Sequence, residues 1–253
     1  MELPKNRFKA GLKAGATQIG LWNSVNSLVL PDALGPIGYD WIVIDTEHSP
    51  VEPTKVMGAL QALEAYPQTS AVVRPVVNDT ALIKQYLDMG AQTLILPYVQ
   101  NSDEARSAVD AMRYPPRGVR GVAGGTRASR YGAIEGYATK AEAELCLIVQ
   151  VETVSAMEQL EDIASVDGVD GVFIGPADLS ASMGYPGQPG HPDVKAEIEN
   201  TFARLQRIGM PGGILTLDPA FAQRCIDLGA AFVAVGVDLS LLTAAARDLR
   251  AKF

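Results

Sequence analysis

The sequence predicts a single (β/α)8 barrel that spans residues 1–253, and three observations support this fold class. Apolar runs typical of buried strands alternate with helical patterns, roughly every 25 to 30 residues. Eight such runs occur, and no linker or change of composition separates them. The length of 253 residues matches that of such barrels, about 250 residues. An open, doubly wound sheet is the alternative, but the strand count and the length favour the closed barrel.

The predicted strands follow one another along the chain, with helical patterns between them. In segments 80–89 and 103–112, for example, apolar residues recur on one helical face. Gly90, Gly209 and Gly229 stand where three helices should end, because glycine adopts the left-handed conformation that closes a helix. The eight predicted strands cover residues 18–22, 41–45, 71–74, 93–97, 145–151, 171–174, 212–215 and 232–235.

The longest irregular segment, residues 114–139, is predicted to be an elaborated loop after the fourth strand and its helix. Its glycines and arginines indicate a mobile or substrate-covering element. Residues 118–127 could cradle a phosphate, but they lack the spacing of a P-loop. A flexible lid with anion-binding arginines is therefore the favoured interpretation.

Composition narrows the classes of partner. The formal net charge of −8 and a pI near 4.8 argue against nucleic acid and acidic membrane surfaces as partners. The uncharged segment 14–31 is interrupted by polar residues and is too polar to span a membrane, and no secretory signal is recognisable. Cys146 and Cys225 lie in apolar surroundings and are predicted to be buried thiols. Together these features predict a soluble, cytoplasmic protein.

Residues at the C-terminal ends of barrel strands form the active site in this fold, so functional residues are expected at these positions. The strand at 41–45 runs directly into Thr46, Glu47 and His48. The chain contains two histidines, and His191 lies beside Gly190 and a proline, in a sequence typical of an exposed turn. His48 is therefore the main candidate for proton transfer near neutral pH.

Glu152 and Asp178 follow two consecutive predicted strands, whose neighbours in a sheet lie about 4.8 Å apart. Two carboxylates in this position could share one cation, and oxygen ligands without thiolates suit Mg²⁺ or Mn²⁺, with Co²⁺ also possible. The alternative is that each carboxylate caps a helix, at Thr153 and at Leu179. Gln150 precedes Glu152 by two residues and lies on the same strand face.

Arg74 ends a predicted strand and should point its guanidinium into the barrel mouth. Burial of this charge requires an anionic partner, which could be a substrate or a structural carboxylate. Beside a metal, Arg74 could stabilise an oxyanion. No lysine lies in a predicted strand, so Schiff-base chemistry is disfavoured. Asp218 and Asp238 are best explained as helix caps.

These residues resemble a known family, the metal-dependent class II pyruvate aldolases, which include 4-hydroxy-2-oxoheptanedioate aldolase and 2-dehydro-3-deoxyglucarate aldolase. The resemblance extends over nearly the whole chain, and the most specific segment is 175–180. The matching segments are residues 20–22, 40–48, 73–75, 113–116, 120–122, 150–153, 171–180 and 235–238.

The resemblance implies a role for each matching position. Glu152 and Asp178 would be the metal ligands, His48 the base, and Arg74 the contact to the keto oxygen of pyruvate. Asp45 would orient His48, and Asp88 would reach the site from a neighbouring subunit. Glu47 receives no role beyond a supporting contact. The substrate-binding residues would be Trp22, Arg74, Gln150, Gly175, Pro176, Ala177, Asp178 and Leu215, with backbone N–H groups of Ala177 and Asp178 on the pyruvate carboxylate.

The resemblance also implies an activity and an assembly. The activity is reversible, metal-dependent aldol cleavage of a 4-hydroxy-2-oxoacid to pyruvate and an aldehyde, through a metal-stabilised enolate. The assembly is a homohexamer, a trimer of dimers that exchange a last helix at about residues 239–251. Residues 123–126, in the loop expected near the aldehyde, differ from the diacid aldolases, so the aldehyde stays open. A carbon–carbon lyase for acyl-CoA thioesters and a non-catalytic anion-binding barrel are the alternatives.

Overall fold

The computed structural model describes residues 1–25 and 27–253, and it confirms the predicted barrel. Eight parallel strands pair in sequence order, and β8 pairs with β1 to close the sheet. Every predicted strand is present, with ends that agree to within two residues. The strands are β1 Gln18–Asn23, β2 Trp41–Asp45, β3 Ser70–Arg74, β4 Thr93–Leu96, β5 Cys146–Val151, β6 Gly171–Ile174, β7 Gly212–Leu215 and β8 Phe232–Val237.

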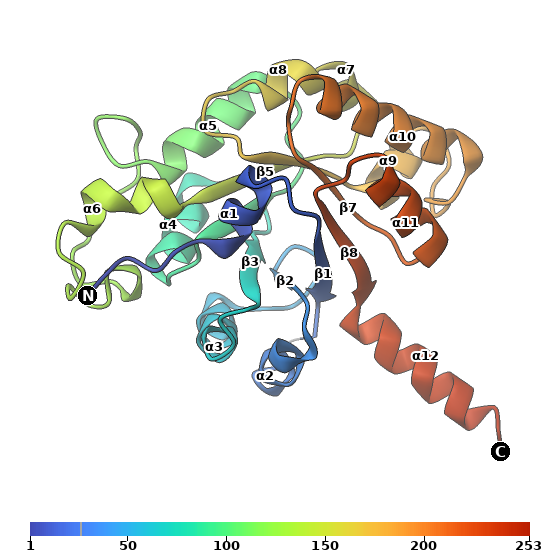
Figure 1. Ribbon diagram of the computed structural model, residues 1–253, viewed down its shortest axis with the longest axis horizontal. Helices are drawn as coiled ribbons and strands as arrows, with labels where there is room; N and C mark the ends of the chain where they lie inside the picture. Colours follow the sequence, from blue (N-terminus) through green and yellow to red (C-terminus); the bar gives the residue numbers. More distant parts are fainter. Residues whose placement is uncertain (26) are drawn as a thin grey trace.

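Helices surround the barrel (Figure 1). Several helices begin with a side chain that caps their first backbone N–H groups. At the start of α4, for example, Asp79 accepts hydrogen bonds from Ala81 N and Leu82 N. Gly90, Gly209 and Gly229 have positive φ and follow helix ends, as predicted. The helices are α1 Arg7–Lys13, α2 Val29–Leu34, α3 Pro53–Glu64, α4 Thr80–Asp88, α5 Ser102–Met112, α6 Tyr137–Lys140, α7 Val154–Glu158, α8 Leu160–Ala164, α9 Pro176–Ser182, α10 Pro192–Arg207, α11 Pro219–Asp227 and α12 Asp238–Arg250, with short 3-10 helices at Gly35–Ile37, Arg127–Ser129 and Ala141–Glu144.

The apolar core has two parts, because successive side chains of a strand point to opposite faces. In β2, Ile42 and Ile44 pack in the layer between the sheet and the helices. Trp41 and Val43 belong instead to the cluster inside the barrel. This inner cluster is rich in aromatic rings, which fill the interior of the barrel.

Helix α1 closes the N-terminal end of the barrel. Phe8 is fully buried, with its ring centroid 5.6 Å from that of Trp41 and 5.5 Å from that of Phe232. The Asn6 side chain donates to Thr93 Oγ1 at 2.9 Å, which ties the start of the helix to β4. Helix α1 therefore covers the N-terminal end of the barrel, opposite the strand ends that carry the polar residues.

Three further features concern the rest of the chain. Cys146 and Cys225 are buried and free, as predicted, and burial raises the pKa of Cys225 to about 12. None of the described helices has the length and apolar character that crossing a membrane requires.

Helix α12 extends away from the barrel (Figure 1) and leaves Leu241, Leu242 and Leu249 exposed.

The packing inside the barrel yields a stability prediction for Gly20. A Cβ atom at Gly20 would lie 2.2 Å from Trp41 Cε2, whereas a Cβ at Gly124 would meet no atom within 4 Å. We expect Gly20→Ala to lower the free energy of unfolding by about 1–3 kcal/mol, because the buried indole has to move. Gly124→Ala, the matched control, should change it by less than about 0.5 kcal/mol. Urea denaturation measures both, and equal midpoints would contradict this account of the inner core.

Candidate active site

The inward-facing rows of the barrel end in polar side chains at the mouth. In β2, Val43 faces inward and Asp45 is the next inward position; in β3, Val72 is followed in the same way by Arg74. Asp45 and Arg74 are direct partners in the register of these two strands. Gln150 ends the corresponding row of β5. The strand-end residues that the sequence singled out therefore do gather in one place.

Arg74 is the buried cation of the mouth, and two carboxylates hold it. Its Nε and Nη2 each lie 2.8 Å from an oxygen of Asp45, and its Nη1 lies 2.8 Å from Glu47 Oε2. The guanidinium carbon lies 4.8 Å from the centre of the Trp22 ring, so one face of the cation is covered by the indole. The arginine is thus fixed in position before any substrate arrives.

The two carboxylates on Arg74 differ in their surroundings. Burial alone would raise the pKa of Asp45, but the hydrogen bonds and charge of Arg74 outweigh burial, and the pKa lies below its ordinary value. For Glu47 burial wins, helped by the charges of Asp45 and Asp178, and its pKa is raised. Arg74 therefore favours the ionised form of Asp45 more strongly than that of Glu47.

Glu152 is a buried carboxylate with little to neutralise it. Its residue is 1% exposed, and its oxygens accept from Tyr98 N at 2.9 Å and from the side-chain amide of Gln150. Burial first, and then the negative charges of Asp178 and Glu47, raise its pKa to about 7. A cation placed between Glu152 and Asp178 would relieve this repulsion.

The space around Glu152 is shaped by a glycine and by an unpaired amide oxygen. A Cβ at Gly175 would lie 2.3 Å from Glu152 Oε2, so only glycine lets the carboxylate lie against this backbone. Gln150 Oε1 is buried and has no hydrogen-bond partner among the described residues. Two carboxylates and an amide oxygen are the ligands that a hard divalent cation prefers, so this set fits the predicted metal.

The capping alternative for the two carboxylates does not hold for Glu152. Thr153 caps α7, with its hydroxyl accepting from Ala156 N at 3.1 Å, which leaves Glu152 free for the mouth. Asp178 lies in the first turn of α9, where Gly175 is the N-cap and no side chain caps the helix. Across the described residues, no three His, Cys, Asp or Glu side chains gather as a self-sufficient metal cluster. A cation here would therefore need further ligands from water or substrate.

His48 lies at the rim of the mouth, and within the single chain it forms no ion pair with its predicted partner Asp45. Each oxygen of Asp45 accepts a hydrogen bond from Arg74 at 2.8 Å. The carboxylate that faces His48 is Glu47, with Oε2 3.8 Å from His48 Nε2. The His48 side chain is 65% exposed. Asp45 instead orients Arg74.

The predicted substrate-binding residues surround the same opening. Trp22 is buried, with its ring centroid 5.4 Å from that of Phe173, and Leu215 packs against this inner cluster from β7. Pro176 begins α9, and Ala177 and Asp178 are exposed in its first turn. The backbone N–H groups of this first turn have no intrahelical acceptor, so they can donate hydrogen bonds to an anion.

The two predicted aspartate caps have different outcomes. Asp218 caps α11, accepting from Ala220 N and Phe221 N, as predicted. Asp238 begins α12, but its buried carboxylate mainly binds the loop after β1, at the Asn23 side chain and at Ser24. Asp238 thus fastens the first strand to the last helix.

Asp88 lies far from the mouth of its own barrel. It ends α4, and its Oδ1 accepts from Arg120 Nη2 at 2.7 Å. Arg120 is fully buried, with its guanidinium carbon 4.5 Å from the centre of the Tyr114 ring. A helix that follows a parallel strand ends near the base of the barrel, so Asp88 could serve only the mouth of another subunit.

The predicted lid is also at the wrong end of the barrel. Segment 114–139 connects α5 to β5 and therefore lies at the N-terminal ends of the strands. Its arginines are held by the protein itself: Arg127 binds Met89 O and Glu64, and Arg130 binds Glu64 as well. Glu64 and Met89 are at the C-terminal ends of α3 and α4. The loop thus neither covers its own active site nor offers free arginines.

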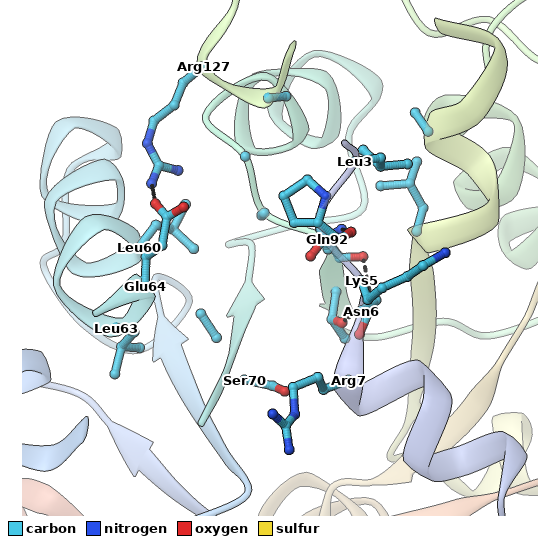
Figure 2. A pocket seen from close by; sticks show the side chains of 18 of the residues that line it. Leu3, Lys5, Asn6, Arg7, Leu60, Leu63, Glu64, Ser70, Gln92 and Arg127 are labelled. Atoms are coloured by element: carbon cyan, nitrogen blue, oxygen red, sulfur yellow. Dashed lines mark hydrogen bonds and ion pairs between the residues drawn. The ribbon is translucent and has the colours of Figure 1, made fainter. Parts of the chain in front are cut away.

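A cavity of about 350 Å³ lies at this base, away from the chemistry (Figure 2). The N-terminal segment lines it with Asn6 and Arg7, beside Ser70 and Gln92 from the starts of two strands. Glu64 and Arg127 pair across its wall. The cavity separates the N-terminal segment from the outer helices and contains none of the predicted site residues.

Two contacts of the mouth were not predicted from the sequence, that of Glu47 with Arg74 and that of Tyr98 with Glu152. Glu47 lies two positions beyond the inward-facing Asp45, a spacing that could have revealed its contact with Arg74. Tyr98 has φ of +57°, which turns its backbone N–H toward Glu152. No sequence signal marks this conformation, because tyrosine rarely adopts it.

Comparison with known proteins places this geometry in a family. Residues 18–245 match the family described as HpcH/HpaI aldolase/citrate lyase. A hydroxypyruvate/pyruvate aldolase of Sagittula stellata is 57% identical, with 100% of both chains covered. A 4-hydroxy-2-oxo-heptane-1,7-dioate aldolase of Escherichia coli is 52% identical, covering 98% of this chain and 95% of that protein. A solved HpcH/HpaI aldolase/citrate lyase family protein from Burkholderia cenocepacia superposes with a TM-score of 0.94 at 37% identity, over 98% of this chain and 99% of that one. The chain therefore belongs to the HpcH/HpaI aldolase/citrate lyase family.

Proposed function

We propose that this protein is a metal-dependent pyruvate aldolase, a carbon–carbon lyase that reversibly cleaves a 4-hydroxy-2-oxoacid to pyruvate and an aldehyde. The observation that carries the proposal is the buried Glu152 beside Asp178, without a neutralising partner, in the same mouth as the fixed cation of Arg74. The family and the two relatives named as aldolases support the reaction class.

Glu152 and Asp178 are the proposed ligands of a divalent cation, with Gln150 Oε1 close to the same place. Such a cation supplies Lewis acidity toward the carboxylate and keto oxygens of a 2-oxoacid. Gly175 has no Cβ and so leaves the space that the carboxylate of Glu152 occupies. The chemistry of these ligands suits Mg²⁺, Mn²⁺ or Co²⁺.

Arg74 is the proposed donor to the keto oxygen. A guanidinium has five N–H donors, and three nitrogen contacts here serve Asp45 and Glu47. The remaining N–H groups can donate to the oxygen on which negative charge develops when the bond between C3 and C4 breaks. Because two carboxylates already hold Arg74, little reorganisation accompanies the reaction.

His48 is the proposed proton carrier. In the cleavage direction it accepts the proton of the C4 hydroxyl, and in the synthetic direction it removes a proton from C3 of pyruvate. Its exposed position at the rim allows the imidazole to exchange this proton with solvent. Trp22 and Leu215 would contact the carbon chain of the substrate from two sides of the opening.

The pyruvate half of the substrate is better supported than the aldehyde half. The names of the two relatives differ in substrate: one is a hydroxypyruvate/pyruvate aldolase and the other a heptanedioate aldolase. Loop 123–126 was expected near the aldehyde, but within one chain it lies at the base of the barrel. It could contact an aldehyde only in a neighbouring subunit.

We further propose a homohexamer, a trimer of dimers, in which α12 is exchanged between subunits. The apolar face of α12 is exposed in the single chain, with Leu241 53% and Leu242 64% exposed. Asp88 would then reach a neighbouring mouth. Small 2-oxoacids and aldehydes are the proposed partners, without nucleic acid or membrane. The two free, buried thiols suit the reducing cytoplasm.

Metal removal tests the proposed ligands. EDTA-treated protein should release no pyruvate from a 4-hydroxy-2-oxoacid, and Mg²⁺, Mn²⁺ or Co²⁺ should restore the activity. Glu152→Gln should lose metal retention and at least about a hundredfold in kcat/KM, because one of two carboxylate ligands is gone. Glu158→Gln, an exposed control on α7, should behave as the unaltered protein. Normal metal affinity of Glu152→Gln in calorimetry would show that the ligand assignment is wrong.

A change at His48 separates proton transfer from metal binding. His48→Asn should lower kcat by about 10² to 10⁴, while calorimetry finds the metal affinity preserved. His191→Asn is the control, since asparagine can still cap α10. If His48→Asn turned over at the normal rate, another group would have to carry the proton.

The exposed face of α12 tests the assembly. Leu242→Glu should reduce the molar mass in light scattering, because a charge would be buried in the subunit interface. Ser240→Glu adds the same charge to the same helix beside this face and should reduce it less. A monomeric unaltered protein would exclude helix exchange.

A further inference from the structure

We infer that Tyr98 is a positioning residue for the proposed metal site: its backbone N–H fixes one oxygen of Glu152, so that the other oxygen is left to bind the cation. The backbone of Tyr98 has this role, and its phenol does not. This inference deepens the proposed aldolase function and rests on it, because Glu152 is one of the proposed ligands.

The backbone of Tyr98 has an unusual conformation. Its φ is +57°, a left-handed value that tyrosine rarely adopts, because Cβ then crowds the following carbonyl oxygen. The side chain is 60% exposed, and its hydroxyl has no hydrogen bond with any residue that the structure describes. Packing of the phenol therefore does not explain the conformation.

The hydrogen bond of the Tyr98 N–H does explain it. The N–H donates to Glu152 Oε1 at 2.9 Å, from the loop after β4 to the residue that follows β5. Glu152 is 1% exposed, so an oxygen without a donor would be costly there. Strained backbone of this kind persists where the surrounding structure holds it, and it is typical of functional sites. The left-handed residue thus supplies a donor that a buried carboxylate needs.

Two contacts hold this corner against β5 and the residues that follow it. Val99 N donates to Gln150 O at 3.0 Å, which continues the pairing of β4 with β5 beyond the end of β4. Gln100 Oε1 accepts from Thr153 Oγ1 at 2.6 Å, and the amide nitrogen of the same side chain donates to Tyr98 O at 3.3 Å. The donor to Glu152 is therefore held in place by the protein itself, before any cation binds.

The two oxygens of Glu152 have different surroundings. Oε1 accepts from Tyr98 N, whereas Oε2 contacts the side-chain amide of Gln150 and lies beside Gly175, where a Cβ would come within 2.3 Å of it. Gly175 is the N-cap of α9, whose first turn carries Asp178, the other proposed ligand. Oε2 is therefore the oxygen that is left for a cation shared with Asp178, and Tyr98 determines which oxygen this is.

The first experiment replaces the N–H of Tyr98 by an ester oxygen. Incorporation of the α-hydroxy acid analogue of tyrosine makes this change and keeps the side chain. Calorimetry of the full-length protein should find a Kd for Mn²⁺ that is at least about tenfold higher, because contacts that support a metal ligand contribute about 10- to 100-fold in affinity. An unchanged Kd would overturn the inference.

Tyr131 provides the matched control for this ester. It is also a left-handed tyrosine, with φ of +55°, and its N–H donates to Thr126 O at 2.9 Å, but it lies in the segment at the base of the barrel. Both esters remove one backbone hydrogen bond of the same length, so both should lower the Tm of the metal-free protein. Only the ester at Tyr98 should weaken Mn²⁺ binding. Equal losses of affinity at the two positions would mean that general destabilisation is the cause, and the inference would be wrong.

Two substitutions separate the backbone of Tyr98 from its side chain. Tyr98→Gly keeps the N–H and adopts this φ without strain, so its Kd for Mn²⁺ should stay within about threefold of that of the unaltered protein. Tyr98→Pro has no N–H and holds φ near about −65°, so it should bind Mn²⁺ at least about tenfold more weakly. If Tyr98→Gly bound as weakly as Tyr98→Pro, the phenol would have the role and the inference about the backbone would fail.

The outcomes distinguish the inference from the proposed function. If the unaltered protein binds no Mn²⁺, the proposed metal site is wrong, and the inference is wrong with it. If the unaltered protein binds Mn²⁺ and releases pyruvate, while the ester at Tyr98 leaves the Kd unchanged, the inference alone fails and the aldolase proposal stands. The left-handed turn would then serve only to bury Val99, which is fully enclosed in the outer core.

Discussion

The strict alternation of side chains along parallel strands is the constraint on which this structure depends. One set of positions fills the barrel with aromatic and aliphatic groups, and the same set, continued to the ends of the strands, delivers Asp45, Arg74 and Gln150 to the mouth. The inward-facing positions of the strands therefore supply both the packed core and the residues of the candidate active site. A shift of one residue in the register of β2 would turn Asp45 toward the helices and Ile44 into the mouth.

The charges of the mouth are unbalanced in a way that defines its chemistry. Four carboxylates, those of Asp45, Glu47, Glu152 and Asp178, face a single guanidinium. Asp45 and Glu47 neutralise Arg74, so Glu152 and Asp178 are left to repel each other and any anionic substrate. A divalent cation neutralises these two carboxylates, and a 2-oxoacid carboxylate can then approach this half of the mouth. The arginine half is complete before the cation binds, whereas the carboxylate half is not.

The sequence predicts much of this arrangement because strands and their ends are local features. Apolar runs located all eight strands, and position alone brought Arg74, Gln150 and Glu152 to the mouth. Partners were harder to predict, since they depend on register between segments far apart. Asp45 pairs with Arg74 because β2 and β3 align them, and Glu47 turns back to the same arginine. The segment 114–139 was misplaced for a similar reason: its arginines bind Glu64 and Met89, partners that no local pattern reveals.

The packing of α1 at the N-terminal end of the barrel has a consequence for the order in which the chain folds. Phe8 completes its packing only against Trp41 and Phe232, the latter at the start of the last strand. The native packing of Phe8 is therefore complete only after β8 has been synthesised. The N-terminal helix thus depends on the last strand for its native packing, and this packing requires a barrel in which all eight strands are present.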